Sequence, residues 1–287
     1  MVINSFYNRR RAAGFTLLEL LVAMSLGLFL LAGLIQVLVT NREVFRVQEN
    51  SSRMQEDGRF VVTVLNSAVS LAGYREDASL TMDTQFPNYT TQANPPAQTF
   101  QEGEVVNGTD NDIGGGDNIK DGTDAIAIRY RSDGGIRDCL GSIVGSGLMS
   151  VNRFYVDDDG TLNCRSDVYN PSTGAAVSSA TQPLIDNVED MQIRYGMNTG
   201  GPFRDVTAEC YLDASVPIGT DNDCTALNFD RVVSVRISLL LHSNDDHLTP
   251  DNTPQTYSYE GLNNVLAGDN RLYRTVTTTI AMRNKIL

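Results

Sequence analysis

Apolar residues gather in one continuous stretch near the start of the chain. From Leu20 to Asn41 there are 22 consecutive uncharged residues, bounded by Glu19 and Arg42. About 20 apolar residues are enough to span the hydrocarbon core of a bilayer as a helix. An ordinary secretory signal has a shorter apolar stretch, followed by a small-residue cleavage site. Here the stretch is longer and no such site follows it, so the pattern predicts a transmembrane helix over about residues 17–40.

After Arg42 the polarity pattern changes but stays helical. Gly58 weakens this second part by about 1 kcal/mol relative to alanine, and Gly73 is placed to cap the helix C-terminus. The pattern predicts one N-terminal helix over residues 15–73, with an amphipathic second half. Its apolar positions recur at mixed three- and four-residue spacings: Val44, Val47, Met54, Val61, Leu65, Ala68 and Ala72.

Beyond this helix, loops alternate with strand patterns. Residues 75–123 have few apolar runs and are rich in Asp, Asn, Gly and Thr, which indicates long surface loops with at most short strands. Period-two alternation with β-branched residues then predicts half-buried antiparallel strands around Ile126–Tyr130, Met191–Tyr195, Val233–Leu241 and Val276–Met282. The apolar face of such a sheet needs a cover, which the amphipathic half of the helix can supply. We therefore predict an α+β fold, with the long helix packed on an antiparallel β-sheet domain over residues 74–287.

Composition excludes several classes of function. The 287 residues carry a net charge of −13, from 22 basic and 35 acidic residues, whereas a nucleic-acid binder normally needs a basic surface. Two His and no Trp leave little material for histidine-based catalysis. The chain has no G-x-S-x-G, P-loop, G-x-G-x-x-G or H-E-x-x-H motif. We expect no enzymatic activity, no cofactor and no nucleic-acid partner.

One acidic residue lies at the start of the apolar stretch. Glu19 is followed directly by Leu20 and Leu21. A carboxylate that enters a membrane is costly unless it is paired, so such a residue is a candidate for function. The alternative is that Glu19 merely marks the membrane interface.

The residues around Glu19 resemble the class III signal of type IV pilins and pseudopilins. Three arginines precede Gly14, Phe15 follows it, and Glu19 comes four residues later, next to the transmembrane stretch. In that family a prepilin peptidase cuts after the glycine and methylates the new N-terminal Phe. The resemblance implies that residues 1–14 are a cleaved leader, that Phe15 becomes N-methylated, and that the net charge falls from −13 to −16. It also implies that Glu19 pairs with the N-terminal amine of a neighbouring subunit.

Further segments resemble the PilW-type minor pilins. The resemblance implies a minor pilin that helps to initiate a type IV pilus and sits at or near its tip, supporting twitching motility and adhesion. Its partners would be prepilin peptidase, other minor pilins, a large tip protein and the major pilin. The implied location is the inner membrane with the β-rich domain in the periplasm, and after assembly the pilus tip at the cell surface. The segments are residues 53–60, 72–74, 138–141, 152–156, 233–241 and 277–284.

Two other functions remain open at this stage. One is an adhesin or DNA-uptake pilin that binds a ligand, and the other is a minor pseudopilin of a type II secretion system. The acidic, glycine-rich segments 107–124 and 243–255 match nothing in the PilW pattern.

The four cysteines, Cys139, Cys164, Cys210 and Cys224, all follow the membrane segment. Disulfides are expected if that side is a periplasm. Three pairings are possible, and the sequential one, Cys139–Cys164 and Cys210–Cys224, is favoured because it closes the shortest loops. A zinc site is the alternative, although no C-x-x-C spacing supports it.

Acidic turns raise a question of calcium binding. Residues 157–160 and 107–124 offer oxygen ligands, but neither segment completes an EF-hand. We expect solvated turns and no metal site.

Overall fold

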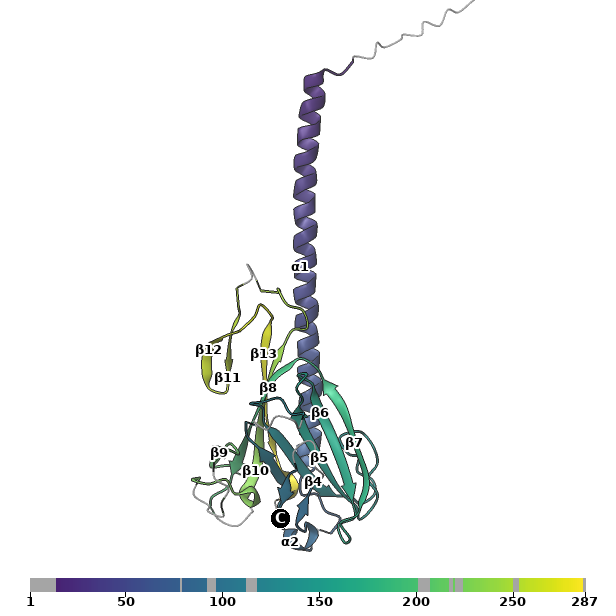
Figure 1. The fold of residues 1–287 in the computed structure, drawn as a ribbon, viewed down its shortest axis with the longest axis vertical. Helices are drawn as coiled ribbons and strands as arrows, with labels where there is room; N and C mark the ends of the chain where they lie inside the picture. The colour runs from purple at the N-terminus through teal and green to yellow at the C-terminus, as the bar shows by residue number, and fades with distance from the viewer. Residues whose placement is uncertain are drawn as a thin grey trace, which may run out of the picture. The chain divides into compact units, whose positions relative to one another are not determined.

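The computed structural model describes residues 14–77, 79–91, 97–111, 118–200, 207–216, 219, 224–249 and 253–285. The chain divides into two compact units, Met1–Glu49 and Asn50–Leu287. Helix α1, Leu17–Ser70, contributes its first part to the first unit and its second part to the second (Figure 1).

The predicted long N-terminal helix is confirmed. Near its end, Leu71 and Ala72 donate backbone hydrogen bonds to Ala68 and Val69, which tightens the last turn. Gly73 then adopts a positive φ of 75°, where a side chain would also crowd Met82. The helix therefore stops at Ser70, and glycine provides the left-handed turn that redirects the chain.

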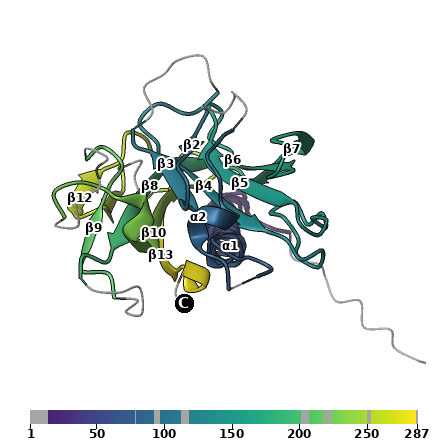
Figure 2. The same ribbon diagram turned by 90° about the horizontal axis from the view of Figure 1, so that it is seen from below.

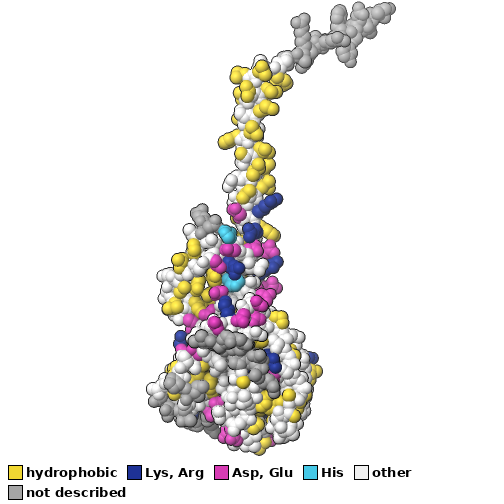
Figure 3. All heavy atoms as spheres, viewed as in Figure 1, with side chains coloured by type: hydrophobic (Ala, Val, Ile, Leu, Met, Phe, Trp, Pro, Cys, Tyr) yellow, Lys and Arg dark blue, Asp and Glu magenta, His cyan; other side chains and the backbone are white. Residues whose placement is uncertain are grey.

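In the first unit, α1 exposes apolar side chains all round. Large residues from Leu20 to Val39 are exposed, and hydrophobic atoms dominate this part of the helix in Figure 3. By length and composition α1 is suited to cross a membrane. An exposed apolar surface of this size requires lipid or other helices around it.

The second unit is built on two antiparallel sheets, which lie side by side in Figure 2. They meet where β8 approaches β4 and β5. The five-stranded sheet has the order β3-β4-β5-β6-β7: Val106–Thr109, Ala125–Arg131, Met149–Val156, Leu162–Tyr169 and Ala176–Ile185. The four-stranded sheet has the order β13-β10-β8-β9: Tyr273–Ala281, Val232–His242, Val188–Met197 and Cys210–Leu212.

Short elements complete this unit. Two hairpins, β1–β2 and β11–β12, form two-stranded sheets of their own, and β11 lies beside the start of β13. The remaining elements have these bounds: α2 Met82–Gln85, β1 Tyr89–Thr90, β2 Thr99–Phe100, η1 Phe229–Arg231, β11 Thr256–Tyr259, β12 Leu262–Leu266 and η3 Arg283–Lys285.

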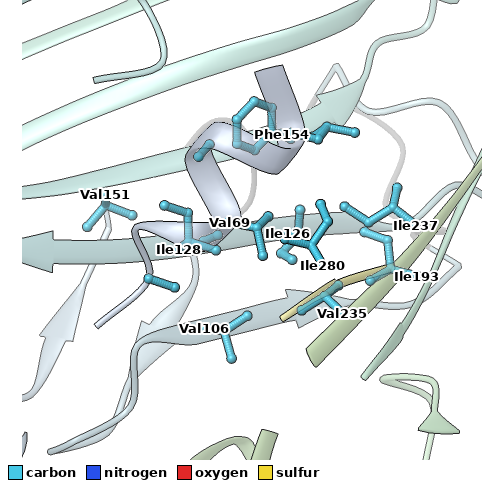
Figure 4. Packing of buried hydrophobic residues seen from close by; sticks show 14 of the residues in the cluster. Val69, Val106, Ile126, Ile128, Val151, Phe154, Ile193, Val235, Ile237 and Ile280 are labelled. Atoms are coloured by element: carbon cyan, nitrogen blue, oxygen red, sulfur yellow. The ribbon is translucent and has the colours of Figure 1, made fainter. Parts of the chain in front are cut away.

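The second part of α1 contributes its apolar stripe to a core shared by both sheets. Val61, Leu65 and Val69 are fully buried there. In Figure 4, Val69 lies beside Ile126 of the five-stranded sheet, with Ile280 of β13 close by. Three- and four-residue spacing keeps these side chains on one helix face, so a single face contacts both sheets.

Two details of the sequence prediction are corrected by the structure. Strands β4 and β10 were expected to be half-buried, but both faces of each strand are buried because they lie inside the domain. The segment 75–123 was expected to form surface loops, yet Phe86, Phe100 and Val105 are fully buried and α2 lies within it. Isolated aromatic residues in a polar segment gave no periodic signal of burial.

Gly58 marks the closest approach of α1 to β13. A Cβ atom at this glycine would lie 2.9 Å from Cγ2 of Val276, which is closer than carbon atoms pack. Val276 is β-branched and has little rotamer freedom with which to move away. The glycine that weakens the helix pattern is therefore required by packing.

We predict that Gly58→Ala lowers the free energy of unfolding by about 1 kcal/mol, because overpacking outweighs the gain in helix propensity. In a Val276→Ala background the same change should raise stability by about 1 kcal/mol, because the obstructing methyl group is gone. Denaturant unfolding of the full chain in detergent micelles, followed by circular dichroism, measures both values.

Ser52→Ala, on an exposed position of the same helix, is the matched control and should change stability little. If Gly58→Ala has the same effect with and without Val276, the close approach does not explain the glycine.

Candidate functional site

The residues of the N-terminal motif lie at the very start of α1. Gly14 is exposed and precedes the helix, and the side chain of Phe15 is 85% exposed. Glu19 is in the first helical turn. The structure thus brings the three predicted residues together at one exposed helix end; residues 1–13 of the predicted leader lie outside the described part of the chain.

Glu19 has a local role that the sequence analysis missed. Its Oε2 accepts a hydrogen bond from the Thr16 N–H at 3.4 Å, and Thr16 Oγ1 accepts one from the Glu19 N–H at 3.2 Å. This reciprocal pair is a capping box, in which an N-cap hydroxyl and an acid three residues later satisfy free helix N–H groups. The T-x-x-E spacing was a readable signal. The carboxylate also lies at the positive end of the helix dipole, which favours its charge.

The cysteines form two disulfides, Cys139–Cys164 and Cys210–Cys224. The first ties the connection between β4 and β5 to the buried Cys164 of β6. The second ties β9 to the segment that leads into η1. Both therefore hold long connections to sheet strands, which restricts the unfolded chain more than the folded one.

The acidic turn at residues 157–160 uses its ligand atoms internally. Oδ1 of Asp157 accepts hydrogen bonds from the backbone N–H groups of Asp159 and Thr161. Its Oδ2 accepts a hydrogen bond from the side-chain amide of Asn163 at 2.7 Å. These bonds close the turn between β5 and β6. Within the described ranges, no three His, Cys, Asp or Glu side chains come close enough to hold a metal ion; residues 112–117 of the other acidic segment fall outside those ranges.

A buried arginine holds the 86–104 segment against β4. The Arg129 guanidinium donates to the carbonyl oxygens of Pro87 and Gln101 at 2.6 and 2.7 Å, and also to those of Phe86 and Glu104. Burial lowers the pKa of Arg129, and burial raises that of the nearby Glu104 carboxyl. Because the guanidinium has no water around it, four carbonyl groups replace its hydration.

A second buried cation lies between β5 and β6. The Arg153 guanidinium pairs with the Asp167 carboxylate at 2.5 Å, and Asp167 also accepts bonds from Arg165 and Ser179. Removing one partner of such a pair leaves a buried charge without a partner, which is strongly destabilising. The pair is therefore a buried link between β5 and β6.

Asp124 joins the two sheets. It precedes β4, its Oδ1 accepts the Asn111 N–H at 2.9 Å, and its Oδ2 accepts the N–H of Ile193 in β8 at 2.7 Å. Its own N–H donates to the Met191 carbonyl at 2.8 Å. Burial raises the pKa of Asp124 to about 7, because the two N–H donors offset the loss of hydration only in part.

This set of residues caps, clamps and joins segments. No part of it arranges a nucleophile beside a base. Next to these residues the described chain presents an exposed apolar helix with an exposed start.

Comparison with known families agrees with this description. Residues 153–284 match the family described as Type IV Pilus-assembly protein W, and residues 9–35 match the prokaryotic N-terminal methylation motif. Among solved structures, the chain is similar to a type IV-like pilin from Thermus thermophilus, with 17% identity, a TM-score of 0.45, and coverage of 82% of this chain and 98% of the other. No curated protein matches the chain.

The methylation motif and the apolar helix that follows it are similar to those of type IV pilin-like proteins. The later part of the chain, residues 153–284, is similar to the PilW family of pilus-assembly proteins. Proteins of this family are structural components and not enzymes. The motif implies processing by a peptidase and assembly with other pilus components, and the apolar helix is suited to membrane anchoring.

We predict that Asp124 makes stability depend on pH. The folded state keeps the Asp124 proton up to about pH 7, whereas an unfolded Asp loses it near 3.8. Raising the pH through this window therefore favours unfolding. The stability of the wild type relative to Asp124→Asn should fall by roughly 1.4 kcal/mol for each pH unit between about 4 and 7.

Urea unfolding of both proteins at several pH values measures the difference, and Asp158→Asn in an exposed turn is the control for a lost surface charge. A difference between wild type and Asp124→Asn that stays constant with pH would show that burial does not hold the proton.

Proposed function

We propose that this protein is a minor pilin that helps to initiate assembly of a type IV pilus and sits at or near its tip. The observation that carries the proposal is the combination, in one chain, of the methylation motif, an exposed apolar helix and a PilW-matching domain. Before assembly the β-rich domain is in the periplasm, and after assembly it lies at the cell surface. Twitching motility and adhesion depend on it through the pili.

Maturation begins with cleavage between Gly14 and Phe15 by prepilin peptidase, followed by N-methylation of Phe15. The exposure of both residues at the helix start supports this step, because a protease needs access to the bond. Residues 1–14 are then the leader, residues 15–73 the helical part with its membrane segment over about 17–40, and residues 74–287 the periplasmic domain.

Assembly depends on Glu19. Inside a bundle of apolar helices its carboxylate needs a cation, and the amine of a neighbouring mature subunit supplies one. Among the residues that the structure describes, the Glu19 carboxylate accepts a hydrogen bond from the Thr16 N–H group alone. Its other lone pairs can therefore accept a bond from the amine. The neighbours are other minor pilins, the major pilin and a large tip protein.

Long loops suit a terminal position better than the repeated shaft. The connections between β4 and β5 and between β9 and η1 are long, and each contains a cysteine of a disulfide. Loops carry much of the recognition in proteins, and at the tip they are free to contact other subunits.

We predict that deletion sharply lowers pilus number while major pilin stays abundant in the inner membrane. In the deletion strain, a wild-type copy should restore pili. A Gly14→Glu copy should instead leave an uncleaved precursor that is retained in the membrane. Glu19→Gln should fail to restore pili, because glutamine keeps the capping box but removes the charge. Electron microscopy of sheared pili and immunoblots of membrane fractions measure these outcomes.

Glu19→Ala, which removes both cap and charge, is the comparison for Glu19→Gln. Normal piliation with Glu19→Gln would show that Glu19 acts as a helix cap and that its charge is not required for assembly. A deletion strain with normal pili that loses adhesion or DNA uptake would favour a ligand-binding pilin, and one that loses only protein secretion would favour a pseudopilin.

A further inference from the structure

A groove of about 650 Å³ lies between the second part of α1 and strand β13. Arg59 and Thr63 line it from the helix, and Arg274 and Thr277 line it from the strand. Gly58 and Val276, whose close packing brings helix and strand together, also line it. All of these residues belong to the second unit.

The groove carries positive charge in an acidic protein. The charged residues among its lining are both arginines, Arg59 and Arg274, while the whole chain has a net charge of −13. Both arginines are exposed, and neither guanidinium has an ion pair or hydrogen bond to any residue that the structure describes. Two unpaired guanidinium groups on the walls of one groove favour an occupant with carboxylate groups.

The strand that forms one wall has an edge that is free beyond its first residues, which lie beside β11. In the described part of the chain β13 forms a ladder with β10 alone. Just past the strand, Met282 donates its N–H to the Val233 carbonyl, which continues the ladder. Backbone groups alternate in direction along a strand, so the even-numbered residues of β13 bond to β10 and the odd-numbered ones point away.

One outward-facing residue already has a strand-like partner. The side-chain amide of Gln255 accepts the Tyr273 N–H at 2.9 Å and donates to the Tyr273 carbonyl at 3.1 Å. This pattern satisfies both backbone groups at the start of the edge. At the next outward position, Thr275, the side-chain hydroxyl donates to the Ser258 carbonyl of β11. Beyond it the outward positions are Thr277 and Thr279, and both are exposed.

Natural sheet edges are normally protected by proline, lysine or a cover. The other long edge strand, β7, contains Pro183. The stretch from Thr275 to Thr279 contains neither proline nor lysine and consists mainly of threonine, which pairs well in sheets. An unprotected edge beside a charged groove is a place where another chain can add a strand.

We propose that this groove receives an extended acidic segment of a neighbouring protein subunit, which pairs as a strand with β13 and directs its carboxylates to Arg59 and Arg274. The proposal rests on the function proposed above, because it supplies a docking surface for a subunit of the assembly. Val276 faces α1, so Arg274, two residues away, lies on the same face of the strand. Every second side chain of an added strand would therefore face the arginines, which predicts an alternating acidic pattern.

A direct test uses the mature full chain in detergent micelles and a fluorescent synthetic peptide that alternates threonine with glutamate. We expect the peptide to bind, measured by fluorescence anisotropy. A peptide that alternates threonine with lysine should bind at least about tenfold more weakly, as expected for loss of a charge-assisted bond. A threonine–glutamate peptide with N-methylated alternate amides, which cannot pair as a strand, should be weakened similarly.

Variants of the protein locate the binding. Arg59→Glu combined with Arg274→Glu should weaken binding by about tenfold or more, whereas Arg137→Glu, a charge reversal at another exposed arginine, should not. Thr277→Pro should also abolish binding, because it removes an outward N–H and leaves the ladder to β10 intact. The N-methylated peptide tests the same strand pairing without altering the protein.

No binding to the wild type, equal binding of the lysine peptide, or full binding of the N-methylated peptide would overturn the proposal. Because the readout is peptide affinity and not pilus number, these results are separate from those that test the minor-pilin function. A protein that binds the peptide but does not restore pili contradicts the function alone.

Discussion

The second part of α1 carries an apolar stripe that has to be covered by both sheets at once. Val61, Leu65 and Val69 are fully buried in one core with side chains from the five-stranded and the four-stranded sheet. Burial of each large apolar side chain contributes about 1.5–3 kcal/mol. The close packing of Gly58 on Val276 follows from the same requirement, because the helix must approach β13 to close the core. The groove lined by Arg59 and Arg274 lies beside this contact.

Buried polar groups complete what the apolar stripe begins. Arg129 holds an irregular segment against β4, and Asp124 joins the beginning of β4 to β8. A buried charge or carboxyl without these partners would be strongly destabilising. These residues therefore determine where the connections lie. The apolar stripe of α1 holds the helix and the two sheets together. The disulfides act on two other connections.

Much of the architecture could be predicted from the sequence because it follows simple periodicity. The long helix, β8, β10 and β13 have clear apolar repeats, and the motif at Gly14 and Phe15 depends on local spacing. Strands β5 and β6 gave no such signal, because buried polar residues such as Ser150, Asn152 and Asp167 interrupt the alternation. Strand β7 is exposed along most of its length and has no apolar face to detect.

The candidate site was predictable in part. Spacing identified Glu19 as unusual, and the capping box with Thr16 could have been found by the same means. The groove at β13 could not, because it depends on the distance between a helix and a strand more than 200 residues apart in sequence. The roles of Asp124 and Arg129 likewise depend on which segments surround them.

Hydrogen exchange in Leu65→Ala tests the central claim, that one helix face stabilises both sheets. The full chain in detergent micelles would be compared with wild type by mass spectrometry of peptides from β4–β5 and β8–β10. Loss of a buried leucine costs about 2–5 kcal/mol, so slowly exchanging amides in both sheets should lose protection by similar factors. If one sheet keeps its wild-type protection, the two sheets do not share a core that depends on α1.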